Sequence, residues 1–284
     1  MEFFMEKDLT TGKITPQLIG FTIPLVLGNL FQLTYNAVDS IIVGRYVGKE
    51  ALAAVGICNP ISTLFILFLN GLCMGASILM GNQFGAKDYD RLHRQISTTM
   101  LSGIAFSLIL SVLCIVFARP ILLLMQVDAS IMGMTINYLR IIFAGLLFTF
   151  MYNCFASTLR ALGDSQSPLL FVLVACIVNV IGDLALVAGL HMDAAGAAIA
   201  TVSAQALSVV FAILLLIKKK LPFTITRHDF RFNPQCPKFL SIGLPLALQE
   251  FLTQLSFLAL CAFVNRLGLE ASSGYGVACK IVNF

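Results

Sequence analysis

Two polar residues, Asn179 and Asp183, lie four positions apart within residues 172–184, a stretch that is otherwise almost entirely apolar. Four positions are about one helical turn, so a helix places both side chains on the same face. In a helix that crosses a bilayer, a carboxylate near the centre costs about 3 kcal/mol. Because of that cost, Asp183 is expected to meet a partner inside the membrane, and Asp39 is the obvious candidate.

Asp39 ends a polar stripe in the first apolar stretch. Asn29, Gln32, Asn36 and Asp39 recur at spacings of three, four and three, with Tyr35 beside them. Such spacing places the side chains along one side of a helix. On a membrane-spanning helix, a polar stripe faces protein or a water-filled cavity rather than lipid.

A site with two carboxylates suits cation chemistry. Two acids that share a cavity of low dielectric constant cannot easily both ionise. The pair can therefore take up a proton, or it can coordinate Na⁺ together with amide and hydroxyl oxygens. The Na⁺ ligands that we predict are Asp39, Asn179 and Asp183. Other polar residues within apolar stretches are Tyr138, Asn153, Thr201 and Gln205.

Not every polar residue in a membrane helix binds a ligand. An intramembrane Asn more often links two helices by hydrogen bonds, and we assign that role individually to Asn29, Asn70 and Asn153. For Asp39 and Asp183 the cost of burial favours function instead. Glu250 stays open between lining the central cavity and stabilising a packing network.

The composition indicates a polytopic all-α membrane protein. Of the 284 residues, 58% are hydrophobic and 11% are charged, whereas soluble domains have about 25% charged residues. The eight cysteines form no Cys-x-x-Cys pair and lie mostly in apolar stretches, where a free Cys acts as a small hydrophobe. The three histidines fall in predicted loops, so a zinc site is not expected. The N-terminal region lacks the features of a cleavable signal peptide.

The apolar stretches are long enough for seven spans and the start of an eighth. We predict the spans at 18–43, 52–80, 96–117, 131–159, 169–190, 194–217 and 239–264, and an eighth from 271. A polar linker covers 218–238. The loops on the side of the N-terminus carry twelve basic residues, and the opposite loops carry four. This bias predicts a cytoplasmic N-terminus in the plasma membrane.

The seventh span repeats the first. Residues 23–27 read Ile-Pro-Leu-Val-Leu and residues 244–248 read Leu-Pro-Leu-Ala-Leu, and the matches continue beyond the spans at an arginine and a glutamate. The copies are six spans apart, an even number, so both have the same orientation, as in two-lobed transporters. We therefore predict a six-helix N-lobe at 1–217, the linker at 218–238, and the first one to two helices of a C-lobe at 239–284. We expect the chain to be a fragment of a longer protein.

Several motifs together resemble those of the MATE (multidrug and toxic compound extrusion) transporters. They lie at 23–56, 81–88, 159–164, 179–183 and 196–201, and include Tyr-Asn-Ala-Val-Asp at 35–39 and Gly-Asn-Gln-Phe-Gly-Ala-Lys-Asp at 81–88. The resemblance extends along the whole chain. It implies twelve spans in two lobes, and export of organic, often cationic, drugs by alternating access in exchange for H⁺ or Na⁺.

The resemblance also implies roles for particular residues. Positions that couple transport to cations in one prokaryotic branch match Asp39, Asn179, Asp183 and Thr201. Neighbouring positions and the drug cavity match Gln32, Tyr138 and Asn153, and we add Tyr35, Asn36 and Glu250 to the predicted cavity. In another branch the coupling carboxylate lies in the seventh span, where this chain has Thr253. Glu250 is about one turn away, which favours coupling in the first lobe.

The alternatives are a flippase and an enzyme. A flippase for lipids or lipid-linked oligosaccharides of the same fold superfamily is the nearest rival, but its cavity is typically basic, and this lobe carries little basic charge within its spans apart from Arg140. A membrane prenyltransferase needs a second acid-rich motif, and an intramembrane aspartyl protease needs Gly at position 180, which is Val. We therefore expect a transporter rather than an enzyme. We expect small-molecule and lipid contacts, no nucleic acid, no cofactor beyond H⁺ or Na⁺, and a monomer when complete.

Overall fold

The computed structural model describes residues 13–125, 127–218 and 235–266, and within these ranges it contains helices and no strands. Six helices are long and apolar enough to cross a membrane, and α4 with α5 forms a further, bent span. The predicted all-α, multi-span fold is confirmed. The elements are α1 (Ile14–Tyr46), α2 (Lys49–Gly85), α3 (Tyr89–Leu124), α4 (Ala129–Ala144), α5 (Leu146–Ala161), α6 (Gln166–Asp183), the π-helix η1 (Leu184–Gly189), α7 (Ala194–Lys218) and α8 (Gln235–Arg266).

Aspartates fix the starts of three helices. Asp88 accepts a hydrogen bond from the backbone N–H of Arg91 (3.2 Å), and Asp128 accepts one from Ser130 (2.8 Å). Asp164 accepts hydrogen bonds from the N–H groups of residues 166 and 167, both at 3.0 Å. Each carboxylate satisfies donors that a helix start leaves unpaired. These caps set where α3, α4 and α6 begin.

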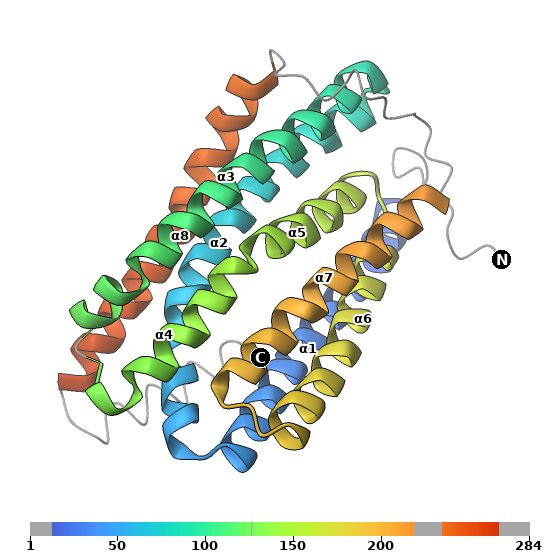
Figure 1. Ribbon diagram of the computed structural model, residues 1–284. Helices are drawn as coiled ribbons and strands as arrows, with labels where there is room; N and C mark the ends of the chain where they lie inside the picture. Colours follow the sequence, from blue (N-terminus) through green and yellow to red (C-terminus); the bar gives the residue numbers. More distant parts are fainter. Residues whose placement is uncertain (1–12, 126, 219–234, 267–284) are drawn as a thin grey trace.

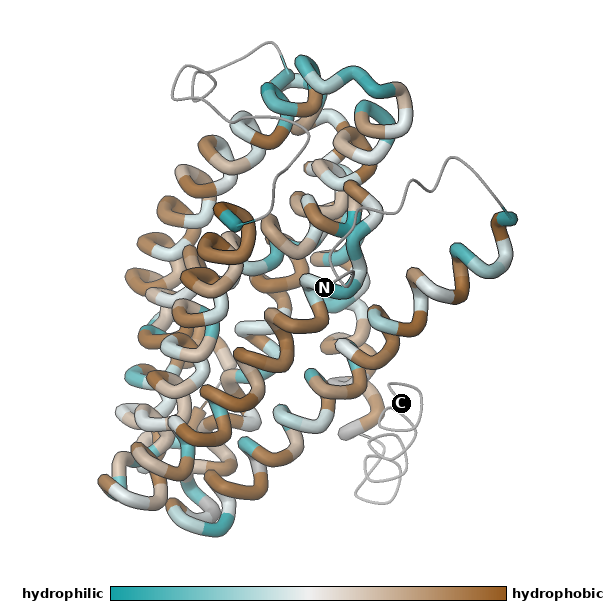
Figure 2. The backbone as a smooth tube through the Cα atoms, turned by 90° about the vertical axis from the view of Figure 1, so that its right-hand side faces the viewer, coloured by the Kyte–Doolittle hydropathy of each residue, from teal (hydrophilic) through white to brown (hydrophobic). Residues whose placement is uncertain are grey.

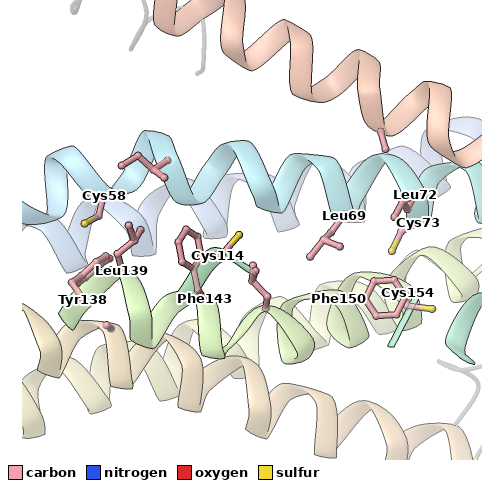
Figure 3. Packing of buried hydrophobic residues seen from close by; sticks show 14 of the residues in the cluster. Cys58, Leu69, Leu72, Cys73, Cys114, Tyr138, Leu139, Phe143, Phe150 and Cys154 are labelled. Atoms are coloured by element: carbon pink, nitrogen blue, oxygen red, sulfur yellow. The ribbon is translucent and has the colours of Figure 1, made fainter. Parts of the chain in front are cut away.

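The helices form two groups (Figure 1). One group contains α1, α6 and α7, and the other contains α2, α3, α4, α5 and α8. The main hydrophobic core lies between α2, α3, α4 and α5, where Leu69, Phe143 and Phe150 are fully buried (Figure 3). A smaller core around Phe171 and Val209 attaches α6 and α7 to α5.

Many large apolar side chains face outward, among them Ile109, Val116, Ile181 and Leu214. Figure 2 shows hydrophobic residues along the middle of the helices and hydrophilic residues toward their ends. A bilayer explains this distribution, because lipid tails solvate apolar side chains and the interface solvates polar ones.

The fourth predicted span, 131–159, is not one straight helix. It is divided at Gly145 into α4 and α5, which meet at a bend of 42°. A Cβ atom at Gly145 would collide with the side chain of Val202 on α7. The absence of a side chain at Gly145 therefore lets α7 pack against the bend, a contact that apolar periodicity could not indicate.

Helix α8 packs directly on α2. Cβ atoms added at Gly71 or Gly75 would collide with the α8 backbone at Ala247 and Gly243, so small residues allow the two helices to touch. This is the packing mode of membrane helices with small residues at their interface. The predicted linker ends too late, because α8 already begins at Gln235. Its third residue is Pro237, and the first turn of a helix tolerates proline.

The two repeated helices also begin at equivalent positions, since Ile14 and Gln235 are 221 residues apart, as are Pro24 and Pro245. Pro24 lies inside α1, because the helix begins at Ile14. The predicted eighth span, from 271, lies outside the described residues.

Candidate functional site

The two predicted carboxylates meet. Asp39 on α1 and Asp183 on α6 lie within hydrogen-bonding distance of each other, although they are 144 positions apart in sequence. Asp183 is fully buried and Asp39 is half-buried. The contact forms where α1 packs along α6.

The environment of the pair supplies no compensating donor. Asp39 Oδ1 and both oxygens of Asp183 are buried without a hydrogen-bond donor in the described part of the chain. An ionised carboxylate can only accept hydrogen bonds. Direct contact between two carboxyl groups therefore requires either a proton on one of them or a cation between them. The structure thus brings the two acids together as expected from the sequence, and cation binding at the pair stays a prediction.

Two tyrosines border the acids. Tyr35 on α1 hydrogen-bonds to Gln32 and lies close enough to interact electrostatically with both Asp39 and Asp183. Tyr138 on α4 is almost fully buried and interacts with the same two acids. It extends from α4 toward α2 beside Cys58 (Figure 3). The acid pair is therefore linked to both helix groups.

Asn179 and Thr201 add a second contact between helices. The side-chain amide of Asn179 on α6 donates to Thr201 Oγ1 on α7 at 3.2 Å. Asn179 Oδ1 is buried and has no donor in the described part of the chain. This oxygen lies one helical turn before Asp183, on the same side of α6. Carboxylate and amide oxygens are ligands that hard cations prefer, so Asn179 Oδ1 is a candidate ligand in addition to the carboxylate oxygens of Asp39 and Asp183.

Asp183 ends the α-helical part of its span. The next six residues, Leu184–Gly189, form η1, and the N–H of Leu190 bonds to the carbonyl of Ala185 five residues earlier (2.9 Å). Such π-helical turns are rare and often occur at functional sites. Sequence reasoning missed this feature and predicted one regular helix over 169–190; the only local signals are glycines at 182 and 189. A Cβ atom at Gly182 would lie 3.0 Å from Ala200 Cβ, so α6 also packs very closely on α7 here.

The remaining predicted cavity residues lie in different surroundings. Gln32 and Asn36 are exposed on α1. Asn153 on α5 donates to the carbonyl of Thr149 in its own helix (2.8 Å) and so does not make the interhelical link that we assigned to it. That link is made by Thr149 and Gln205, whose side-chain oxygens are 2.6 Å apart between α5 and α7.

Glu250 belongs to the other helix group. It is half-buried on α8, which packs on α2 and α3, whereas the acid pair lies between α1 and α6. Arg140 is exposed on α4. The structure therefore gathers Asp39, Asp183, Tyr35 and Tyr138 beside the Asn179–Thr201 contact, and leaves Glu250 on a separate helix.

Comparisons with known proteins identify the family of the chain. Residues 24–185, more than half of the chain, match the MatE family. The chain is 30% identical to the probable multidrug resistance protein YoeA of Bacillus subtilis over 100% of this chain and 64% of the relative. It is 25% identical to the multidrug export protein MepA of Staphylococcus haemolyticus, over 99% of this chain and 62% of the relative.

A solved structure has the same fold. A MOP superfamily transporter from Pyrococcus furiosus superposes with a TM-score of 0.86 at 24% identity, covering 99% of this chain and 63% of that one. The chain thus spans less than two thirds of the length of these relatives. The resemblance noted in the sequence is confirmed, and the chain belongs to the MATE family of multi-pass membrane transporters.

Proposed function

We propose that a protein containing this chain is a secondary active multidrug exporter, driven by H⁺ or Na⁺ that binds at Asp39 and Asp183. The observation that carries the proposal is the contact between these two carboxyl groups, which are held together without a donor. The names of the relatives, which refer to multidrug resistance and multidrug export, support the class of substrate. The relatives are longer than this chain, and export would require the complete second lobe that the sequence repeat predicts.

The cation would control how α1 sits against α6. With a proton or Na⁺ between them, the carboxyl groups attract and the two helices stay together. When the cation leaves, two negative charges face each other in a poorly solvated site, and their repulsion favours separation of the helices. α1 suits such movement, because most of its surface is exposed and Pro24 removes one hydrogen bond from its interior.

Alternating access follows from this coupling. Cation binding from outside would close or bend the first lobe and expel the drug. Return of the carboxylates to the charged state would favour drug binding from inside. Gln32, Tyr35 and Asn36 on α1 would present polar groups to the drug, with Tyr138, Asn153 and Glu250 contributing from α4, α5 and α8. We further propose a plasma-membrane monomer with a cytoplasmic N-terminus and no bound cofactor other than the coupling ion.

The test is drug efflux from cells that carry the complete transporter with Asp39→Asn or Asp183→Asn. Each change removes one ionisable group but keeps its size, and we expect at least a tenfold loss of ion-driven efflux, on the order of one missing charge-assisted contact. Asp88→Asn is the matched control, because it changes an aspartate that caps α3 far from the pair.

Efflux measured under an imposed pH gradient and under an imposed Na⁺ gradient identifies the coupling ion. Efflux that follows a pH gradient and ignores a Na⁺ gradient identifies H⁺, and the reverse identifies Na⁺. Unchanged efflux and ion dependence in both variants would remove the acid pair from the mechanism. Movement of a lipid-linked sugar without drug export would place the protein among the flippases.

A further inference from the structure

Two cysteines from different helices touch in the core of the second helix group. Cys73 on α2 and Cys154 on α5 are both buried, at 1% and 3% exposure, and their thiols are within hydrogen-bonding distance. Both lie between the same two helices in Figure 3, beside the ring of Phe150. Both cysteines are free, so no disulfide joins them.

The surroundings of this pair are rich in sulfur. Cys73 and Cys154 line the same narrow packing gap, which is too small for a water molecule, together with Met80 and the hydroxyl side chains of Thr99, Ser157 and Thr158. Cys154 also lines the neighbouring gap, to which Met100 and Met151 contribute. Thiolate and thioether sulfur atoms are the soft ligands that select Cu(I) and similar ions.

A positive charge without an acidic partner lies beside the pair. The Arg160 guanidinium donates from Nε to the carbonyl of Ala156 and from Nη2 to Ser157 Oγ, both at 3.2 Å. It forms no ion pair with a described residue, and it interacts electrostatically with Cys73. A half-buried cation held only by neutral oxygens can stabilise a negative charge placed nearby.

We propose that Cys73 and Cys154 form a two-thiolate binding site for a soft monovalent metal ion such as Ag(I) or Cu(I). Binding M⁺ to two thiols forms two metal–sulfur bonds and releases two protons. The product carries one negative charge, which the Arg160 guanidinium offsets. Met80 is placed to add a thioether ligand. A bound ion would join α2 to α5 and hold the packed core together.

The experiment uses the purified chain and Ag⁺ alone, after exposed thiols have been blocked with N-ethylmaleimide. The first equivalent of Ag⁺ should release two protons, measured with a pH indicator in weak buffer. In Cys73→Ser and in Cys154→Ser it should release one, because a single thiol remains at the site. Cys58→Ser is the matched control: Cys58 is buried on the same helix, but its thiol donates to the carbonyl of Thr135 (3.5 Å). That variant should still release two.

Two results would overturn the proposal. One is release of a single proton by the first equivalent in the unchanged chain. The other is an equal effect of the Cys58 and Cys73 substitutions. X-ray absorption of the unchanged chain with one equivalent of Ag⁺ gives an answer that does not depend on whether the variants fold. We expect at least two sulfur neighbours, and one sulfur neighbour would show that the cysteines merely pack as small hydrophobes.

Discussion

The two helix groups differ in the charge of the buried polar atoms that lack a hydrogen-bond partner. In the group α2–α5, hydroxyls bond to backbone carbonyls, as Ser111 does to Phe143 across two helices (2.7 Å). Where a partner is missing there, the atom is neutral, as at Gln95 Oε1 and Thr98 Oγ1. A neutral orphan costs about 1–3 kcal/mol, and a charged one costs more. The group of α1, α6 and α7 also has neutral orphan atoms, Ser167 Oγ and Asn179 Oδ1, but among the described residues the orphan carboxylate oxygens, those of Asp39 and Asp183, all lie in this group.

This difference indicates that helices α2–α5 form a packed scaffold, whereas the α1–α6 contact carries the groups proposed to bind the ion. Neutral orphan groups are tolerable in a closely packed core, and nothing needs to bind them. The carboxylates of Asp39 and Asp183 are tolerable only with a proton or another cation. Under the proposed function, the α1–α6 contact is the place where the free energy of the lobe depends on an ion. Substitutions that disturb the packing of the scaffold should lower stability, whereas substitutions at the ion site should change its dependence on the cation.

The largest effect is expected at Gly103 in the scaffold. A Cβ atom there would collide with the ring of Phe150, which is fully buried. Gly103→Ala should lower the free energy of unfolding by about 2–3 kcal/mol through overpacking. Thermal melting in detergent measures it. In the control, Gly133→Ala, the new atom meets nothing within 4 Å, so the gain in helix propensity should leave stability equal or higher. Equal losses at both sites would contradict the close packing.

The second prediction exchanges one acid of the pair. Asp39→Asn gives Asp183 an N–H donor and removes the need for a cation, so the chain should become more stable by about 1–2 kcal/mol in Na⁺-free buffer at alkaline pH. Melting curves with and without Na⁺ measure the change. Stabilisation at the expense of function is usual where a site is strained. A clear loss of stability in the variant would argue against a donor-free contact.

A smaller effect is expected at Gly182, where α6 approaches α7. The added methyl group of Gly182→Ala would lie 3.0 Å from Ala200 Cβ, so the helices must separate by a few tenths of an ångström. We expect a loss of about 1 kcal/mol. Since Asp183 follows directly, cation affinity should fall with stability. The variant Gly56→Ala meets open space and serves as the control. If Gly182→Ala leaves cation binding unchanged, the packing at Gly182 does not influence the site.

The smallest effect concerns Asp128, which is outside the spans. The hydrogen bond from the backbone N–H of Ser130 holds the pKa of Asp128 below its usual value. A carboxyl group whose pKa is lowered by folding stabilises the fold above its unfolded pKa, near 3.9. That contribution is lost as the pH falls through the lower, folded pKa. Asp128→Asn keeps a capping side chain and should flatten this part of the melting profile slightly. If Asp128→Asn and the unchanged chain lose stability identically as the pH falls, the Asp128 carboxylate makes no such contribution.

Sequence reasoning located the spans and the acid pair for physical reasons. Length and apolarity are set by the bilayer, and an intramembrane carboxylate stands out by its cost. The bend at Gly145 and the closeness of α8 to α2 depend on contacts between residues far apart in the chain. The spacing of apolar residues along the sequence does not indicate such contacts. For the same reason Cys73 and Cys154 were read as small hydrophobes, since nothing local indicates that they meet.

The central claim is that Asp39 and Asp183 hold one exchangeable cation between them. Infrared spectroscopy of the purified chain tests it directly, because a protonated carboxyl group has its own stretching band. In Na⁺-free buffer the account predicts a band that disappears as the pH rises or as Na⁺ is added, and that is absent in both Asp39→Asn and Asp183→Asn. A band that persists in both variants, or one that neither pH nor Na⁺ changes, would contradict it.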